Sequence, residues 1–85
     1  MQVTIDGLKI CLARSGDGSW HAISDVCTHE EYSLSEGDIW GNHVECALHG
    51  SRFNLVTGEP DQLPARTPVR VYQVEVRGGS VFVKM

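Results

Sequence analysis

Turn-forming residues interrupt this chain at close intervals and leave room only for short secondary-structure elements. The main interruptions are Asp6-Gly7, Ser15-Gly16-Asp17-Gly18, Glu36-Gly37-Asp38, Gly41-Asn42, Thr57-Gly58-Glu59-Pro60 and Gly78-Gly79. Between them, apolar and polar residues alternate with a period of two, which is typical of strands that bury one face. No segment shows the apolar period of a convincing helix. The chain is therefore predicted to be an all-β domain.

The alternating segments give the positions of the expected strands. They are Val3 to Ile5, Leu8 to Leu12, Trp20 to Asp25, Ile39 to Trp40, His43 to Glu45, Val69 to Val76 and Val81 to Val83. Gly78-Gly79 has the composition of a two-residue hairpin turn between the last two strands. The apolar register shifts by one residue at Tyr72-Gln73, which predicts a β-bulge there.

The length of the chain predicts a single domain over residues 1–85, with little stability to spare. A chain this small buries only about 60% of the surface that it exposes when unfolded. Its 41% hydrophobic and 21% charged residues are nevertheless ordinary for a globular protein. We therefore expect it to fold, with a bound cofactor or another crosslink contributing to its stability.

The charge balance excludes a nucleic-acid-binding surface. Seven basic residues are scattered among eleven acidic ones, for a formal net charge of -4, whereas proteins that bind phosphate backbones concentrate lysine and arginine. No apolar run approaches the roughly 20 residues that cross a bilayer, and no secretory signal segment follows Met1. We therefore expect a monomeric cytoplasmic protein with neither nucleic acid nor a membrane as a partner.

Two cysteine and histidine pairs are the strongest chemical signal in the sequence. Cys27-x-His29 is followed, after sixteen residues, by Cys46-x2-His49. In a reducing compartment, thiols beside histidines bind metals or do chemistry more often than they form disulfides. Zinc accepts two thiolates and two imidazoles in a tetrahedral site, although Cys-x-His is an uncommon half of one. A nucleophilic Cys/His dyad needs one pair and an oxyanion-binding motif, so two matched pairs favour a metal centre.

The stretches CTH and CALHG, at residues 27–29 and 46–50, resemble the signature of the Rieske family of iron–sulfur proteins. Further agreement comes from LSEGD at 34–38, HGSRFN at 49–54, TGEP at 57–60 and Pro64. The resemblance extends from about Val3 to Met85. It implies a small Rieske fold, in which antiparallel sheets form a sandwich with two cluster-binding loops at one end. Family ferredoxins have about one more strand and turn before the position of Val3, so an edge strand is expected to be missing here.

The resemblance implies one [2Fe-2S] cluster per chain and assigns its four ligands. One iron would be held by Cys27 and Cys46, and the other by His29 and His49. Two neutral imidazoles in place of two thiolates remove negative charge beside the iron that is reduced. The potential then rises from about −400 mV to about −150 mV or higher. Because the ligands also crosslink two loops, we expect the cluster to supply much of the folding free energy.

The resemblance also assigns six residues to the surroundings of the cluster: Tyr32, Leu48, Gly50, Ser51, Phe53 and Pro64. Tyr32 and Leu48 stand where the respiratory members of the family carry a disulfide. Ser51 matches a serine whose hydroxyl donates a hydrogen bond to a cluster sulfur, whereas Phe53 replaces a tyrosine that donates another. Fewer donors stabilise the reduced state less, so we expect a potential at the low end of the Rieske range.

A third loop, at residues 58–64, is expected to close over the cluster. The resemblance implies that Tyr32, Leu48 and Pro64 cover it, while the ring edges of the two histidine ligands remain at the surface as the exit for electrons. The plainer alternative is that the three covering residues are ordinary core or loop residues.

The length of the chain and its ligand set favour one branch of the family. The resemblance implies a small ferredoxin of bacterial aromatic-ring dioxygenase systems, which is not an enzyme. Such a protein carries one electron at a time from a flavin-dependent NAD(P)H reductase to a terminal non-haem iron oxygenase. No residues outside the two pairs could supply the second iron site of the oxygenase itself. Two alternatives stay open: a structural zinc module, and a cluster-based redox sensor or accessory protein.

Residues outside the two pairs have plainer interpretations. Cys11 lies on the apolar side of an alternation and is expected to be a buried thiol without a redox role. His21 and His43 fall outside the ligand spacing, and His43 is expected to face solvent. The acidic residues near the ligands either steer a basic partner or form a solvated surface. They are Glu30, Glu31, Glu36, Asp38 and Glu45.

Overall fold

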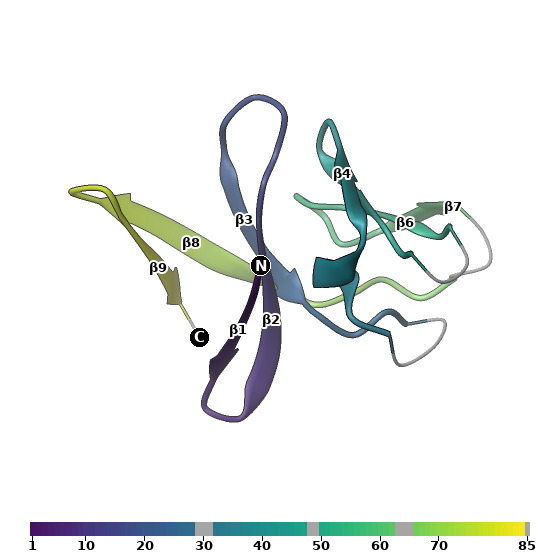
Figure 1. Cartoon of the computed structure of the whole chain (residues 1–85), viewed down its shortest axis with the longest axis horizontal. Helices are drawn as coiled ribbons and strands as arrows, with labels where there is room; N and C mark the ends of the chain where they lie inside the picture. Colours follow the sequence, from purple (N-terminus) through teal and green to yellow (C-terminus); the bar gives the residue numbers. More distant parts are fainter. Residues whose placement is uncertain (29–31, 48–49, 63–65, 85) are drawn as a thin grey trace.

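The computed structural model describes residues 1–28, 32–47, 50–62 and 66–84, which form two antiparallel sheets (Figure 1). The larger sheet has the strand order β1-β2-β3-β8-β9 and comprises β1 (Gln2–Ile5), β2 (Leu8–Arg14), β3 (Trp20–Ser24), β8 (Val71–Arg77) and β9 (Ser80–Lys84). The smaller sheet has the order β4-β5-β6-β7 and comprises β4 (Asp38–Trp40), β5 (His43–Glu45), β6 (Arg52–Asn54) and β7 (Pro60–Gln62). A short 3-10 helix, η1 (Leu34–Glu36), precedes β4, and no helix of the described residues is long and apolar enough to cross a membrane. The predicted all-β fold is confirmed.

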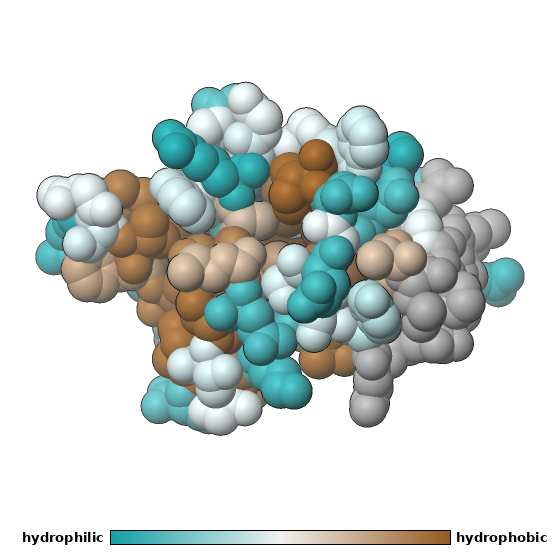
Figure 2. Space-filling view, viewed as in Figure 1, coloured by the Kyte–Doolittle hydropathy of each residue, from teal (hydrophilic) through white to brown (hydrophobic). Residues whose placement is uncertain are grey.

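The larger sheet buries apolar side chains on both of its faces. Successive residues of a strand point to opposite sides of a sheet, so β2 and β3 contribute to two separate clusters. One of them, the outer core, consists of Ile10, Ala22 and Tyr72, with partly buried residues of β1, β2, β8 and β9 packed against it. Figure 2 shows apolar residues gathered over the side of the molecule that holds β8 and β9. The last hairpin therefore completes the outer core together with β1, β2 and β3.

The second cluster, the central core, joins the two sheets and contains both cysteines of the predicted metal site. Full burial of a large apolar side chain contributes about 1.5–3 kcal/mol, so this core fastens the smaller sheet and its loops to the larger sheet. Its buried members are Cys11, Ala13, Ile23, Cys27, Leu34, Val44, Cys46, Phe53, Leu55 and Val69.

Most strands lie where the sequence predicts them, and so does the hairpin turn at Gly78-Gly79. Two short strands, β6 and β7, are not predicted. The three residues of β6 are too few for an alternation to be recognised. The strand β7 begins at Pro60, which in the sequence belongs to a turn-forming stretch. Because β7 is an edge strand, its first residue can lack a backbone N–H without weakening the sheet.

The predicted β-bulge at Tyr72-Gln73 is wrong. The pairing of β8 with β3 and with β9 shows no register shift. Val69 lies in the central core before the strand begins, whereas Tyr72 and Val74 belong to the outer core. The apparent slip marks the point where the chain leaves one core and joins the other.

Candidate metal centre

The first predicted loop is closed at its base by a backbone hydrogen bond and tied to a distant segment by a side chain. Cys27 is 3% exposed, and its N–H donates to the carbonyl of Tyr32 at 3.0 Å. The hydroxyl of Thr28 donates to the carbonyl of Thr67 at 2.5 Å, across 39 positions of the chain. The loop is therefore held both by a hydrogen bond of its own and by one to a residue far away in the sequence.

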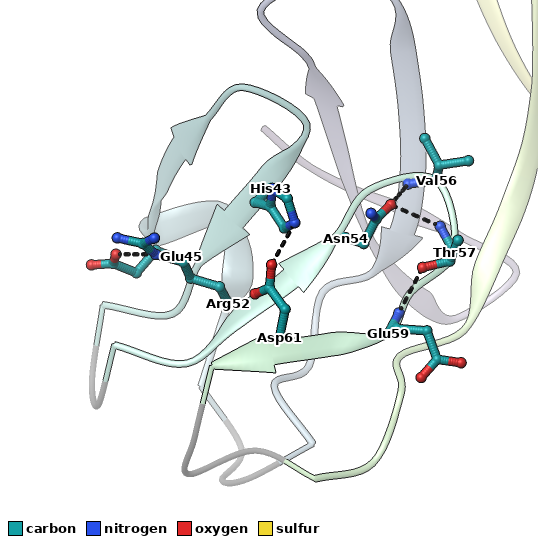
Figure 3. A network of polar contacts seen from close by, with 8 residues as sticks. All are labelled: His43, Glu45, Arg52, Asn54, Val56, Thr57, Glu59 and Asp61. Atoms are coloured by element: carbon teal, nitrogen blue, oxygen red, sulfur yellow. Dashed lines mark hydrogen bonds and ion pairs between the residues drawn. The ribbon is translucent and has the colours of Figure 1, made fainter.

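The second predicted loop connects β5 to β6 as a hairpin. Cys46 directly follows β5, is 2% exposed, and donates its N–H to the carbonyl of Ser51 at 2.7 Å. Gly50 donates to the carbonyl of Cys46 at 2.9 Å and has a φ of 76°, a conformation that glycine adopts without steric cost. At the base of the loop, Glu45 and Arg52 are ladder partners and form an ion pair of 3.0 Å (Figure 3).

The two loops share one form of closure. In each, the N–H of the cysteine donates to the carbonyl of the residue five positions later. Neither thiol is in a disulfide bond, and both lie in the central core. Among the described residues no group of three metal-binding side chains comes together, and the predicted ligands His29 and His49 lie outside that part of the chain. The structure thus brings the two predicted sulfur ligands into one core, and the imidazole ligands stay a prediction.

The residues predicted to surround the cluster are placed in part. Ser51 and Phe53, which follow the second loop, are fully buried, and Phe53 shares the central core with both cysteines. Tyr32 closes the first loop through its carbonyl, and its side chain is 36% exposed. Leu48 and Pro64 lie outside the described residues. That these side chains cover or tune a cluster stays a prediction.

Beyond β6 the chain reverses in a tight turn that Asn54 organises. Its Oδ1 accepts hydrogen bonds from the N–H groups of Val56 at 2.7 Å and Thr57 at 3.1 Å (Figure 3). Gly58 has a φ of 78°, and a β-carbon there would lie 2.2 Å from the carbonyl oxygen of Val69. Only glycine allows this approach. The TGEP stretch thus sets the start of the predicted third loop through its backbone.

Cys11, His21 and His43 lie outside the two loops. Burial raises the pKa of the Cys11 thiol from 9.0 to about 11, so this thiol stays protonated at neutral pH and is the buried residue that the sequence predicts. The Nε2 atom of His21 lies 3.1 Å from the Oγ atom of Ser15. His43 does not simply face solvent as predicted. Its Nε2 atom lies 2.5 Å from the Oδ2 atom of Asp61 on β7 (Figure 3).

The acidic residues near the loops differ in their surroundings. Glu36 and Asp38 are exposed, whereas Glu45 is paired with its ladder neighbour on β6. Glu30 and Glu31 lie outside the described residues. A role of these carboxylates in steering a basic partner stays a prediction.

Two polar residues beside Cys27 fasten the first loop without a recognisable signal in the sequence. One is Thr28, whose partner is described above. The other is Asp25, which is 1% exposed and accepts hydrogen bonds from the side chain of Gln2 and the backbone of Ser35. Their partners lie elsewhere in the sequence. The only signal that could have identified Asp25 and Thr28 is that they lie within two positions of Cys27.

The chain resembles known proteins over nearly its whole length. Residues 1–73 match the model of the Rieske [2Fe-2S] domain. Ferredoxin CarAc from Metapseudomonas resinovorans is 43% identical over 79 residues, which cover 93% of this chain and 73% of the relative. The biphenyl dioxygenase ferredoxin subunit from Pseudomonas sp. (strain KKS102) is 39% identical over 84 residues, which cover 98% of this chain and 76% of the relative. These relatives are electron-transfer ferredoxins, so the prediction that the chain is not an enzyme is confirmed.

Solved structures agree with this placement. The ferredoxin of carbazole 1,9a-dioxygenase from Nocardioides aromaticivorans IC177 superposes with a TM-score of 0.92 at 39% identity, and the match covers 98% of this chain and 81% of that chain. A chain in the complex of reduced oxygenase and oxidized ferredoxin in carbazole 1,9a-dioxygenase gives the same TM-score and identity, and the match covers 99% of this chain and 86% of that chain. Sequence, fold and paired loops agree, and the chain belongs to the Rieske [2Fe-2S] domain family.

Proposed function

We propose that this chain is a one-electron carrier, a single domain over residues 1–85 with one [2Fe-2S] cluster held by Cys27, His29, Cys46 and His49. The observation that carries the proposal is the pair of matched loops, which bring two buried cysteines into the central core of a Rieske domain. Two thiolates and two neutral imidazoles are the donor set of a Rieske centre. The described residues therefore fit the sulfur half of such a site.

The residues of the chain would hold the two cysteines in place and shield their sulfurs from water. Each cysteine N–H is used in closing its loop, so a change of the backbone there breaks a hydrogen bond. When bound, the cluster supplies reversible uptake and release of one electron, at a potential that its ligands and the hydrogen bonds to its sulfurs set. Ser51 would donate one such bond, and Phe53 has no hydroxyl to donate another. We therefore place the potential at the low end of the Rieske range.

The proposed electron acceptor is a terminal non-haem iron oxygenase, and the proposed donor is a flavin-dependent NAD(P)H reductase. The acceptor is supported by relatives that are ferredoxin components of dioxygenase systems, and by a similar chain in a complex with an oxygenase. The donor is supported by chemistry, because flavin cofactors mediate between hydride transfer from NAD(P)H and one-electron chemistry. A carrier of single electrons needs such a source.

An anaerobic reductive titration followed by mixing with an oxygenase tests this function. The purified holoprotein should take up one electron per chain, bleach reversibly, and pass the electron to the oxygenase component of carbazole 1,9a-dioxygenase. Cys46→Ser protein, prepared in the same way, is the matched control and should take up none. A wild-type chain that accepts no electron contradicts the proposal. Reduction without any transfer to the oxygenase would favour the redox-sensor alternative instead.

A further inference from the structure

Asp25 is a buried carboxylate at the base of the first loop. It lies one residue beyond β3 and two residues before Cys27, and it is 1% exposed. Its Oδ2 atom accepts a hydrogen bond from Nε2 of Gln2 at 2.5 Å, and its Oδ1 atom accepts one from the N–H of Ser35 at 2.7 Å. Each carboxylate oxygen thus has its own donor, which a neutral amide side chain with one oxygen could not match.

The backbone of Asp25 is held as firmly as its side chain. Its N–H donates to the carbonyl of Lys9 at 3.0 Å, and its carbonyl accepts from the N–H of Leu34 at 2.7 Å. The four bonds connect Asp25 to β1, to β2 and to η1. Immediately after it, Val26 and Ser33 form the isolated β-bridge that brackets the loop. A change at Asp25 would therefore loosen the base from which Cys27 projects.

No side-chain cation of the described residues pairs with this carboxylate. The ion pairs of lysine, arginine and histidine in that part of the chain all involve other acids. The field of a buried charge extends into the surrounding core. Burial is the main cause that raises the pKa of Cys11; the N-terminal ammonium lowers this pKa, and the negative charge of Asp25 raises it. Cys11 and Cys27 belong to the same central core.

We propose that Asp25 is a positioning residue for the first loop, which fixes the base of the loop through Gln2 and Ser35 and also lowers the reduction potential of the group that Cys27 helps to hold. This inference rests on the proposed function. The second effect follows from sign alone, because a buried negative charge opposes the addition of an electron nearby. A purely structural role would loosen the loop without fixing the direction in which the potential moves.

Three holoproteins test the proposal through their potentials and the rate at which their visible absorption bleaches. Asp25→Asn removes the charge and sets an amide against the Gln2 amide, so its potential should rise and its bleaching should be about tenfold faster. The double variant Gln2→Glu/Asp25→Asn restores a donor and an acceptor at this contact, so bleaching should slow to within about twofold of the wild type. Asp17→Asn is the matched control. Asp17 lies in the distant β2–β3 turn, where it accepts from Ser19, and both readouts should stay unchanged.

The outcomes separate this inference from the proposed function. Equal bleaching rates together with an unchanged or lowered potential in Asp25→Asn overturn the inference, while a wild type without visible absorption overturns the proposed function as well. If Asp25→Asn retains no cluster, Gln2→Ala decides, because it keeps the charge of Asp25 and removes the hydrogen bonds that Gln2 donates to Asp25 and, at 3.3 Å, to Ser33. Faster bleaching of Gln2→Ala at an unchanged potential supports the inference, and bleaching at the rate of the wild type contradicts it.

Discussion

The two cysteine loops close in the same way but are anchored differently. Cys27 and Cys46 each donate their N–H to the carbonyl five residues later. The second loop is the connection of a β-hairpin, so residues next to it in sequence hold its base. The first loop depends on Gln2, from the edge strand β1 of the larger sheet, and on Thr67. The same loop closure is therefore supported by local strand pairing in the second loop and by long-range polar contacts in the first.

This difference teaches where each loop is vulnerable. The base of a hairpin is stabilised by the hydrogen bonds of its own ladder. Because the paired residues are close in sequence, forming it loses little chain entropy during folding. Long-range polar contacts form only after distant segments have come together, and each contributes about 1 kcal/mol on average. We expect the first loop to loosen before the second when the protein is destabilised.

The largest expected effect is the loss of the metal centre when either loop loses its cysteine. Cys27→Ser and Cys46→Ser should each lower bound iron and acid-labile sulfide to near zero, because both sulfurs serve one site. Cys11→Ser is the matched control and should keep both. Iron and sulfide are measured per chain in anaerobically purified protein. If either variant retained its iron and sulfide, the cysteine that it lacks would not be a required ligand of the site.

The second effect tests the support that the base of the second loop receives from the residue just before β4. A β-carbon on Gly37, just beyond η1, would lie 1.8 Å from the carbonyl oxygen of Glu45, the residue before Cys46. Gly37→Ala must move backbone and should cost about 3 kcal/mol of unfolding free energy, measured in urea. In the control Gly16→Ala, the nearest atom to the new β-carbon is at 3.4 Å. Equal stability of the two variants would show that the second loop needs no such contact.

The third effect concerns Cys11, the thiol of the central core that lies in neither loop. Burial raises the pKa of Cys11 to about 11, above the 9.0 of an unfolded chain. The folded state therefore holds this proton more tightly, and the stability that it contributes is complete below pH 9 and is lost as the pH rises toward 11. Between these values the wild type should lose about 2 kcal/mol more than Cys11→Ala does. Parallel pH profiles from urea unfolding would contradict the buried position.

The smallest effect concerns the first loop alone. Thr28→Val keeps the shape of the side chain and removes the hydroxyl that donates to Thr67, so it should cost about 1 kcal/mol. Bleaching of the visible absorption should also become faster. Thr4→Val, at an exposed position of β1, is the control for the substitution itself and should change neither quantity. Thr28→Val protein as stable as this control would show that the first loop does not depend on its distant tie.

The same contrast explains what the sequence could and could not predict. Strands, the Gly78-Gly79 turn and the second loop depend on neighbouring residues, so their patterns are visible in the sequence. The bonds of Asp25 and Thr28 depend on partners that only the folded chain brings near. The sequence does not predict β7, because proline interrupts most strands and is tolerated only at an edge. The contact of His43 with Asp61 also joins strands that are not consecutive.

The central claim is that the two loops hold one cluster with sulfur ligands on one iron and imidazoles on the other. Pulsed electron paramagnetic resonance of the reduced protein, with and without ¹⁵N-labelled histidine, tests it directly. The account predicts hyperfine coupling to two histidine nitrogens that shifts on labelling. A reduced iron–sulfur signal without nitrogen coupling, or a colourless protein with one zinc per chain, would contradict it.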